Sequence, residues 1–380
     1  MKVAVLGVST TIFGELWQVS PRQLVREAAG EALKKSALVV KDIDALYVGN
    51  MLSGVLGGQE NLGAFFAEEL GLSCPAFKIE GACASGGLAF YNAGVAVRSG
   101  IFKNVLVVGV EKMTDHKPED VATGLMGAGS EAERQAGATF PGLYALLARV
   151  HMQKYGTTEE EMAAVAVKNH YHASLNGKAH FKNQITIEQV LKSPKIADPL
   201  KLLDCSPVSD GAAAVVISSD TQRVGKPIFI KGAGVATDTL GLAERRDLTS
   251  LSAAIKAAKT AYREAGMIPR DVDVAEVHDC FSIAEILAME DLGFYKKGEA
   301  GKAILLGETT LGKGTLVVNT SGGLKACGHP VGATGVKQIA EIVTQLRGEA
   351  EKKQVMGAKI GLTHNVGGSG AVAVVHIFSV

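Results

Sequence analysis

Short apolar runs alternate with amphipathic segments along the chain of 380 residues. The runs NVLVVGV (104–110) and AAAVVI (212–217) have the length of buried strands, whereas PRQLVREAAGEALKKSAL (21–38) has a helical period. Because such strands and helices alternate, the pattern favours parallel central strands that are covered by helices on both sides. The predicted fold class is α/β.

The two halves of the chain repeat the same pattern. The segment VKDIDALYVGN (40–50) and the later segment PRDVDVAEVHD (269–279) each follow a predicted helix. The halves also end alike, with DGAAAVVIS (210–218) and SGAVAVVHI (369–377). Repetition over this range indicates a duplicated α/β unit. We place the boundary near residues 220–227, which gives an N-terminal half of residues 1–225 and a C-terminal half of residues 226–380.

A longer and less periodic region, about residues 115–205, precedes the last strand of the first half. It is rich in Gly, Met and His. Insertions of this size between regular elements often carry function. We predict a lid or substrate-binding subdomain made of loops.

The charge balance, the apolar runs and the cysteines of the chain indicate which kinds of partner and location to expect. Lys+Arg and Asp+Glu are 39 each, without long runs of one charge, so we expect neither nucleic acid nor a membrane surface as partner. The apolar runs are all much shorter than the roughly 18 residues of a membrane span. Five scattered cysteines and the lack of an export signal favour reduced thiols and a cytoplasmic location.

Cys83 lies in the stretch IEGACASGGLAFYNAG (79–94), where a helix that is apolar on nearly every face is predicted to begin. The dipole and free N–H groups of a buried helix N-terminus would lower the pKa of this thiol and make it a nucleophile. Cysteine is also among the most buried residue types, so a packing role is equally compatible with this stretch alone.

Two further stretches could supply partners for this thiol. His329 lies in the glycine-rich loop TSGGLKACGHPVGATG (320–335), and a neutral imidazole there could accept the thiol proton. The stretch EVHDCFSIAE (276–285) closes a predicted strand and places His278 and Cys280 at its C-terminal end. In open α/β sheets, sites form at that end.

The last candidate loop is THNVGGSGAVAVV, which begins at Thr363. His364 and Asn365 could contact substrate, and the N–H groups of the turn through Gly367 and Gly368 could hold an oxyanion. A tight turn between two strands explains the same glycines. All four stretches together are less easily explained by chance than any one of them.

Taken together, these motifs resemble those of a thiolase over essentially the whole chain, and most of all the archaeal and sterol-carrier-protein-type branch. The stretches that carry the resemblance are GACASGG around Cys83, LLDCSPVSDGAAAVV (202–216), HDCF (278–281), SGGLKACGHPVGATG (321–335) and HNVGGSGA (364–371). The resemblance implies that the two halves form a five-layered α/β/α/β/α core, with one helix from each half buried between the sheets.

The resemblance also implies roles for single residues. Cys83 matches the nucleophile that becomes acylated, and His329 matches the imidazole that activates it. His278 stands where many thiolases carry Asn, beside the thioester oxygen of the second substrate. Many thiolases place a second cysteine in the last loop as Cys-x-Gly, which is missing here, so Cys280 is expected to be the second acid/base.

The implied reaction is reversible Claisen condensation of two acyl-CoA molecules, most simply two acetyl-CoA to acetoacetyl-CoA and CoA, without a metal or another cofactor. One alternative is a decarboxylating ketosynthase, which uses one Cys and two His; Cys280 and Pro330 argue against it. Another alternative is a non-catalytic subunit that scaffolds a pathway complex, although the chemically active positions are intact.

The substrate and partners are less well defined. The basic segment 167–183 carries Lys168, Lys178 and Lys182, which could hold CoA phosphates or form a solvated face. Cys327 is interpreted chiefly as a small packing residue.

The resemblance implies a homodimer or homotetramer with sheets paired edge to edge. It also implies a role in lipid and mevalonate precursor metabolism, and a complex with hydroxymethylglutaryl-CoA synthase and a small zinc-ribbon protein.

Overall fold

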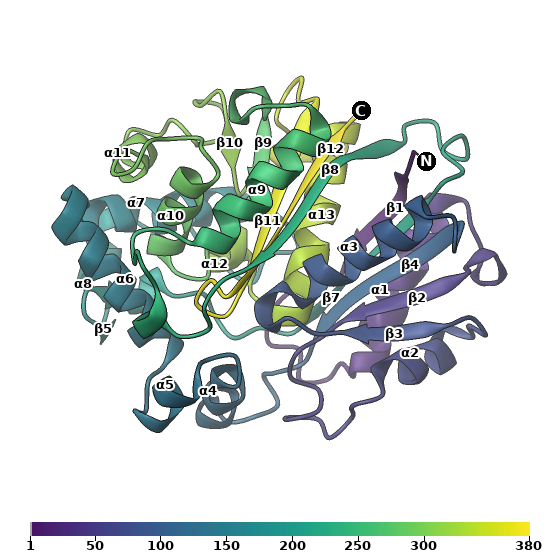
Figure 1. The fold of residues 1–380 in the computed structure, drawn as a ribbon, viewed down its shortest axis with the longest axis horizontal. Helices are drawn as coiled ribbons and strands as arrows, with labels where there is room; N and C mark the ends of the chain where they lie inside the picture. The colour runs from purple at the N-terminus through teal and green to yellow at the C-terminus, as the bar shows by residue number, and fades with distance from the viewer. Residues whose placement is uncertain (1) are drawn as a thin grey trace.

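The computed structural model describes residues 2–380 and shows the two α/β halves side by side (Figure 1). The first half contains β1 (Ala4–Thr10), α1 (Pro21–Ser36), η1 (Val40–Asp42), β2 (Ala45–Gly49), α2 (Leu62–Leu70), β3 (Ala76–Ile79), η2 (Ala82–Ala84), α3 (Ser85–Arg98), β4 (Asn104–Glu111) and β7 (Gly211–Ser218). The second half contains β8 (Ile228–Thr237), η4 (Leu242–Glu244), α9 (Ser252–Ala265), η5 (Pro269–Asp271), β9 (Val274–Glu276), α10 (Ser282–Asp291), α11 (Ala300–Leu305), β10 (Val317–Val318), α12 (Gly323–Cys327), α13 (Val331–Arg347), η6 (Glu351–Lys353), β11 (Ile360–Gly367) and β12 (Val372–Ser379).

The strands form one continuous ladder of hydrogen bonds with the order β10-β9-β11-β12-β8-β1-β7-β4-β2-β3. Within this sheet the halves join through β1 and β8, which pair at Ala4 with Phe229 and at Val5 with Ile228. Each half therefore contributes five strands in the same relative order, as the internal repeat predicts.

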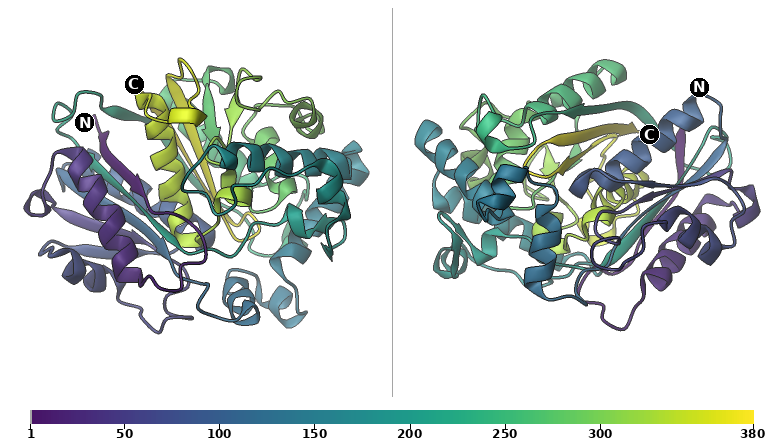
Figure 2. Two further views of the ribbon diagram at one scale, coloured as in Figure 1. Left: turned by 180° about the vertical axis from the view of Figure 1, so that it is seen from behind. Right: turned by 60° about the horizontal axis from the view of Figure 1, so that its bottom comes forward.

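The packing of the helices confirms the predicted layers. One apolar cluster combines α3 and α13 with inward-facing strand residues of both halves, including Val107 and Val274. A second cluster packs α1 and α2 on the outer face of the strands of the first half, and a third packs α9 and α10 on the outer face of the strands of the second half. Figure 2 shows α13 in the middle of the molecule and α1 on the outside.

Glycines allow the two central helices to meet at their N-terminal ends. A Cβ atom on Gly86 of α3 would lie 2.6 Å from the carbonyl oxygen of Gly332 in α13, and one on Gly335 would lie 2.3 Å from the Gly87 nitrogen. Any side chain at these positions would push the helices apart. This close approach brings the residues that precede each helix together.

The prediction of parallel central strands is wrong. Strand β2 is parallel to β3 and β4, and β9 is parallel to β10 and β11, but the central strands β4, β7, β1, β8, β12 and β11 pair antiparallel in succession. A strand buried on both faces has the same apolar run in either direction, so the sequence pattern does not encode direction.

The insertion is also more ordered than expected. It holds α4 (Pro118–Met126), α5 (Glu131–Gln135), α6 (Phe140–Tyr155), α7 (Glu159–Ser174), α8 (Ile187–Lys192), β5 (Lys195–Ala197), β6 (Leu200–Lys201) and η3 (Leu202–Asp204). Helices α6 and α7 bury one side against the second half, where Tyr144, Leu147 and Val165 join the same apolar cluster as α10. The predicted loop subdomain is therefore a helical layer fixed to the core.

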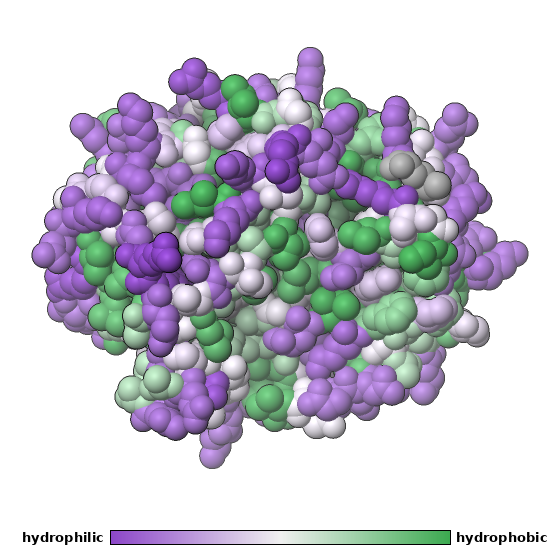
Figure 3. All heavy atoms as spheres, in the orientation of Figure 1, coloured by the Kyte–Doolittle hydropathy of each residue, from purple (hydrophilic) through white to green (hydrophobic). Residues whose placement is uncertain are grey.

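The surface agrees with the balanced charge. Hydrophilic side chains cover most of the face in Figure 3, and apolar ones occur in small groups between them. Within residues 2–380, the helices are all too short or too polar to cross a membrane.

Candidate active site

Cys83 is presented by a tight turn at the start of α3. It is the middle residue of η2, and the preceding Ala82 has a left-handed φ of 53°. This conformation is unfavourable for a residue with a Cβ atom and costs about 1–3 kcal/mol. The turn is held because Glu80 accepts the Ala82 N–H at 2.6 Å and the Ser85 hydroxyl accepts the Gly81 N–H at 3.0 Å.

His329 precedes α13 and is held through its Nδ1 atom, which lies 2.7 Å from Thr334 Oγ1. The Thr334 hydroxyl donates its single proton to the Pro330 carbonyl oxygen at 3.0 Å, so it accepts from His329. The proton of the neutral imidazole is therefore on Nδ1. The lone pair on Nε2 remains free to act as a base.

His278 follows β9 and is held in the opposite way. Its Nδ1 lies 3.3 Å from Nδ2 of Asn365, while Oδ1 of Asn365 accepts the Gly87 N–H at 3.1 Å. The amide group of Asn365 thus points its N–H at the ring, and His278 Nδ1 is the acceptor. The ring proton is on Nε2, so this imidazole is a hydrogen-bond donor.

The thiol and the two imidazoles converge although they lie far apart in the sequence. The Cys83 sulfur and one ring nitrogen each of His278 and His329 lie within 4.8 Å of one another. The two rings meet edge to face, with centroids 5.2 Å apart. A proton donor (His278), a proton acceptor (His329) and a nucleophile (Cys83) therefore lie next to one another.

Burial keeps these groups neutral. It lowers the pKa of His329 to about 3 and that of His278 well below its usual range. Burial also raises the pKa of the Cys83 thiol to about 12, and a hydrogen bond from the Gly368 N–H offsets this only in part. The expectation that the helix N-terminus lowers the pKa of this thiol is wrong, because removal from water outweighs the dipole. Cys83 therefore requires a base.

Cys280 lies in the same cavity. It is buried beside Cys83, and burial followed by repulsion from Cys83 raises its pKa well above the usual range. The Tyr144 hydroxyl of α6 hydrogen-bonds the Cys280 thiol and lies 3.2 Å from the Gly368 carbonyl oxygen, and its ring packs at a tilt against Phe281. Sequence reasoning missed Tyr144, since nothing in its surrounding sequence sets it apart from other core residues of the insertion.

A cavity of about 220 Å³ surrounds these groups. Its floor contains both thiols and both imidazoles, and Gly368 of the last loop lies beside them. The walls are mostly apolar and come largely from the insertion; they include Pro118, Val121, Leu125, Phe140, Pro141 and Val208. The insertion therefore forms the wall of the cavity.

The residues of the last loop, 364–368, differ in whether they face the cavity or are held by the protein. Gly368 has a left-handed φ of 62° and turns its N–H toward Cys83, and Gly367 directly precedes it at the end of β11. Asn365 contacts the Cys83 carbonyl oxygen at 2.9 Å as well as His278, so its amide is committed to protein atoms. His364 is buried outside the cavity lining, and among the described residues neither of its ring nitrogens has a hydrogen-bond partner.

The three lysines of the basic segment lie elsewhere. Lys168 is buried, with its ammonium 2.7 Å from Glu285 and 2.9 Å from the Val318 carbonyl oxygen. This internal ion pair is not compatible with the predicted contact between Lys168 and CoA phosphates. Lys182 is exposed, away from the lining of the cavity.

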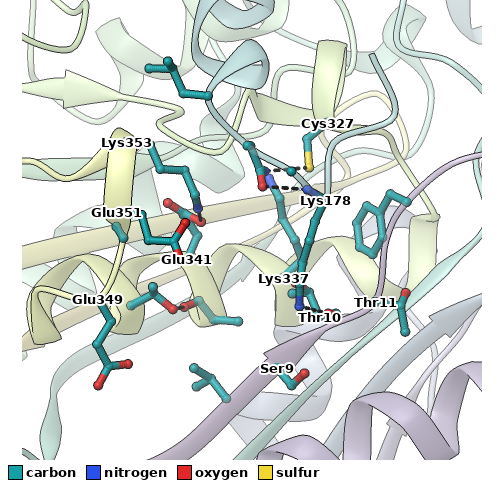
Figure 4. A pocket seen from close by; sticks show the side chains of 18 of the residues that line it. Ser9, Thr10, Thr11, Lys178, Cys327, Lys337, Glu341, Glu349, Glu351 and Lys353 are labelled. Carbon is teal, nitrogen blue, oxygen red and sulfur yellow. Dashed lines mark hydrogen bonds and ion pairs between the residues drawn. The ribbon is translucent and has the colours of Figure 1, made fainter. Parts of the chain in front are cut away.

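Lys178 instead lines a second, polar cavity of about 300 Å³ (Figure 4). Its ammonium donates to the Thr10 carbonyl oxygen. Cys327 faces this second cavity, and its sulfur is 3.7 Å from Asn176 Nδ2. The Cys327 thiol therefore lies away from the cavity that holds His329, and it also packs in a small apolar cluster with Phe13 and Ala333.

Two buried carboxylates fix the loops that carry the site. Asp279 accepts the N–H groups of Leu324 and Lys325 and so ties the HDCF stretch to α12. Glu111 accepts the N–H groups of Met51 and Gly332 and so ties β4 to the start of α13. Burial raises the pKa of each carboxyl to about 7.

Comparison with known proteins matches the same regions. Residues 3–221 fit the model of the thiolase N-terminal domain, and residues 234–380 fit that of the thiolase C-terminal domain-like family. The chain is 51% identical to an acetyl-CoA acetyltransferase of Methanothermobacter thermautotrophicus, over 99% of both chains. It is 46% identical to the acetyl-CoA acetyltransferase of Methanocaldococcus jannaschii, over 99% of this chain and 98% of the other.

More distant proteins share the fold. Human sterol carrier protein 2 is 33% identical over 98% of this chain and 71% of its own length. The solved structure of an Ltp2-ChsH2(DUF35) aldolase superposes with a TM-score of 0.85 and 25% identity, over 100% of this chain and 97% of the other. Since both family models and these relatives span nearly the whole chain, the protein belongs to the thiolase family.

Proposed function

We propose that this protein catalyses the reversible Claisen condensation of two acetyl-CoA molecules to acetoacetyl-CoA and CoA. Two relatives at 46% identity or more carry the name acetyl-CoA acetyltransferase. The observation that carries the proposal is the site itself: a thiol, a neutral imidazole base and a neutral imidazole donor within 4.8 Å.

Acylation uses the first two groups. His329 Nε2 takes the proton of Cys83 as the sulfur attacks the thioester carbonyl carbon of acetyl-CoA, and CoA leaves with the proton that His329 returns. The Gly368 N–H, which faces the Cys83 sulfur, is placed to stabilise negative charge there. Because burial keeps both the thiol and the imidazole neutral in the resting state, proton transfer and attack occur together.

Condensation uses Cys280 and His278. The Cys280 thiol first gives its proton to neutral His329, which lines the same cavity. The resulting thiolate removes a proton from the methyl group of a second acetyl-CoA, and the Nε2–H of His278 donates to the enolate oxygen that forms. The enolate carbon then attacks the acetyl carbonyl on Cys83 and expels the Cys83 sulfur, which takes the proton from His329, while Cys280 keeps the methyl proton as its thiol. Burial makes the Cys280 thiolate a strong base, as removal of a proton alpha to a thioester requires.

The cavity limits the choice of substrate. About 220 Å³ with mainly apolar walls accommodates a short acyl chain beside the two thiols. A decarboxylating ketosynthase would generate its carbon nucleophile by loss of CO₂ and would not need Cys280 in the same cavity. The buried thiol at that position therefore favours condensation by deprotonation.

We also propose that this chain forms a homo-oligomer and a complex with other proteins. Strand β3 is at one edge of the sheet, and its exposed Phe77 could lie against a second copy, which supports a homodimer or homotetramer. A complex with hydroxymethylglutaryl-CoA synthase and a zinc-ribbon protein is supported only by analogy with the aldolase structure, whose title pairs Ltp2 with a DUF35 protein. Such a complex would supply mevalonate precursors in the cytoplasm.

The test is the conversion of acetoacetyl-CoA and CoA to acetyl-CoA, which is measured as the disappearance of acetoacetyl-CoA. Cys83→Ala should abolish the reaction. After incubation with acetyl-CoA, mass analysis of peptides should find the acetyl group on Cys83. An acetyl group on Cys280 or Cys327 and none on Cys83 would contradict the assignment, and turnover of malonyl-CoA alone would favour a ketosynthase.

A further inference from the structure

The side chain of Asn365 is fixed at both ends. It is buried on β11, with Oδ1 accepting the Gly87 N–H at 3.1 Å. Its Nδ2 is 2.9 Å from the Cys83 carbonyl oxygen and 3.3 Å from Nδ1 of His278. A flipped amide would place two donors against each other at Gly87 and two acceptors against each other at Cys83, so one orientation is strongly preferred.

This orientation has a chemical consequence for His278. An amide nitrogen can only donate, so Nδ1 of the ring must accept and cannot carry the proton. The neutral imidazole then carries its proton on Nε2, which is buried and, within residues 2–380, has no hydrogen-bond partner. A buried donor without a partner, in a ring that lines the cavity, is free for a substrate oxygen.

We propose that Asn365 is a positioning residue that fixes the tautomer of His278, so that this ring presents an N–H and not a lone pair to the cavity. The catalytic role of this tautomer rests on the proposed condensation, in which the N–H donates a hydrogen bond to the enolate oxygen. The tautomer itself is a property of the folded protein and can be measured without any turnover.

The same tautomer determines whether the site binds a metal ion. The Cys83 sulfur and one nitrogen from each imidazole lie within 4.8 Å of one another, at most about 1.5 Å wider than the spacing of roughly 3.3–3.6 Å between ligands of tetrahedral zinc, and Cys and His are ligands that zinc prefers. A nitrogen that carries a proton cannot ligate. Asn365 therefore removes one of three donors, and it protects the nucleophile from zinc.

Asn365→Asp tests this directly, because the two side chains have the same shape. One carboxylate oxygen still accepts the Gly87 N–H. The other faces the Cys83 carbonyl oxygen without a proton between them, and it accepts a proton from His278 Nδ1, which leaves a lone pair on Nε2. Carboxylate–histidine pairs of this kind typically strengthen metal binding by roughly 10- to 100-fold. The variant should bind Zn²⁺ and Co²⁺ tighter than wild type by about this factor, and condensation should fall by roughly 100- to 1,000-fold.

Cobalt gives a readout that packing changes alone do not produce. Co²⁺ bound to the variant should show sulfur-to-cobalt charge-transfer absorption. That band should disappear in Asn365→Asp combined with Cys83→Ser, and equally in Asn365→Asp combined with His278→Asn. Unchanged metal affinity in folded Asn365→Asp protein, or a band that survives loss of His278, would overturn the proposal.

A second measurement does not depend on the folding of the aspartate variant. In His278→Asn, the new amide brings its own N–H and has no tautomer to fix. Asn365→Ala should then slow condensation much less in the His278→Asn background than in wild type, whereas a purely structural role of Asn365 predicts equal factors in both. If wild type makes no acetoacetyl-CoA at all, the proposed function fails, yet the cobalt titration still reports the tautomer.

Discussion

Thr334→Val removes one hydrogen bond from the base and changes little else. Thr334 is buried, and its hydroxyl accepts from His329 Nδ1 at 2.7 Å and donates to the Pro330 carbonyl oxygen at 3.0 Å. Valine keeps the shape of threonine but leaves the Nδ1–H of His329 buried without a partner. Removing a hydrogen-bond acceptor from a buried donor costs about 1–3 kcal/mol.

This cost increases in the transition state for acylation, where His329 takes the Cys83 proton and becomes positively charged. Hydrogen bonds to charged groups contribute about 1.5–3 kcal/mol. The ground state loses the same bond in its neutral form, so only the difference of about 1–1.4 kcal/mol slows the reaction, and acylation of Cys83 should slow by roughly 5- to 10-fold. Thr334→Ser retains the hydroxyl and should acylate at nearly the wild-type rate.

The assay mixes enzyme with acetyl-CoA, stops the reaction in acid after increasing times and measures the acetylated fraction of Cys83 by mass. Unfolding in urea, measured for both variants, shows how much of each protein is folded at the assay temperature. Folded Thr334→Val protein that acylates as fast as wild type would refute the assigned tautomer of His329. Equal loss in Thr334→Val and Thr334→Ser would also refute it, because only the former removes the acceptor.

Three further predictions follow. Cys280→Ala should leave acylation of Cys83 largely intact but slow condensation by roughly 100- to 10,000-fold, and His364→Ala should not reproduce this separation when both steps are timed. Lys168→Met should leave Glu285 buried without its cation, lower the free energy of unfolding by about 3–5 kcal/mol and leave the KM for acetyl-CoA unchanged, whereas a phosphate contact would raise KM. In urea unfolding, stability should fall on acidification from pH 7 to 5.5. Burial lowers the pKa of seven histidines, which therefore bind protons more weakly in the folded protein than in the unfolded one: His170, His172, His180, His278, His329, His364 and His376. Each such group with a folded pKa of about 3 costs about 1.4 kcal/mol one pH unit below its unfolded pKa of about 6.5; carboxyls with a raised pKa, such as Glu111, oppose this trend but are fewer, and stability that rises on acidification would contradict it.

The sequence allowed prediction of those parts of the site that depend on local order. A helix that begins beside Cys83 and a strand that ends before His278 could be expected from apolar periodicity, and the repeat indicated that corresponding ends would meet. Tyr144 and Thr334 could not be expected, since each acts through one contact that only the tertiary structure creates. The same holds for the ion pair of Lys168, whose partner lies on another helix.

The pKa of Cys83 shows why a local rule can give the wrong sign. A helix N-terminus stabilises a thiolate by about 0.3–2 kcal/mol. Burial of an unpaired thiolate costs more, and in this structure it raises the pKa of Cys83 to about 12. How deeply a residue is buried depends on the whole fold, which the sequence around Cys83 does not reveal.

The duplicated fold explains why the nucleophile and the base face each other. Cys83 lies two residues before α3 begins at Ser85, and His329 lies two residues before α13 begins at Val331. The repeat thus brings two corresponding helix N-termini to one point, with a thiol on one and an imidazole on the other. Both dipoles direct positive potential at this point, which favours an oxyanion and disfavours an imidazolium. His329 therefore holds a proton only briefly after taking it from Cys83, and this makes it an effective acid for the departing CoA thiolate.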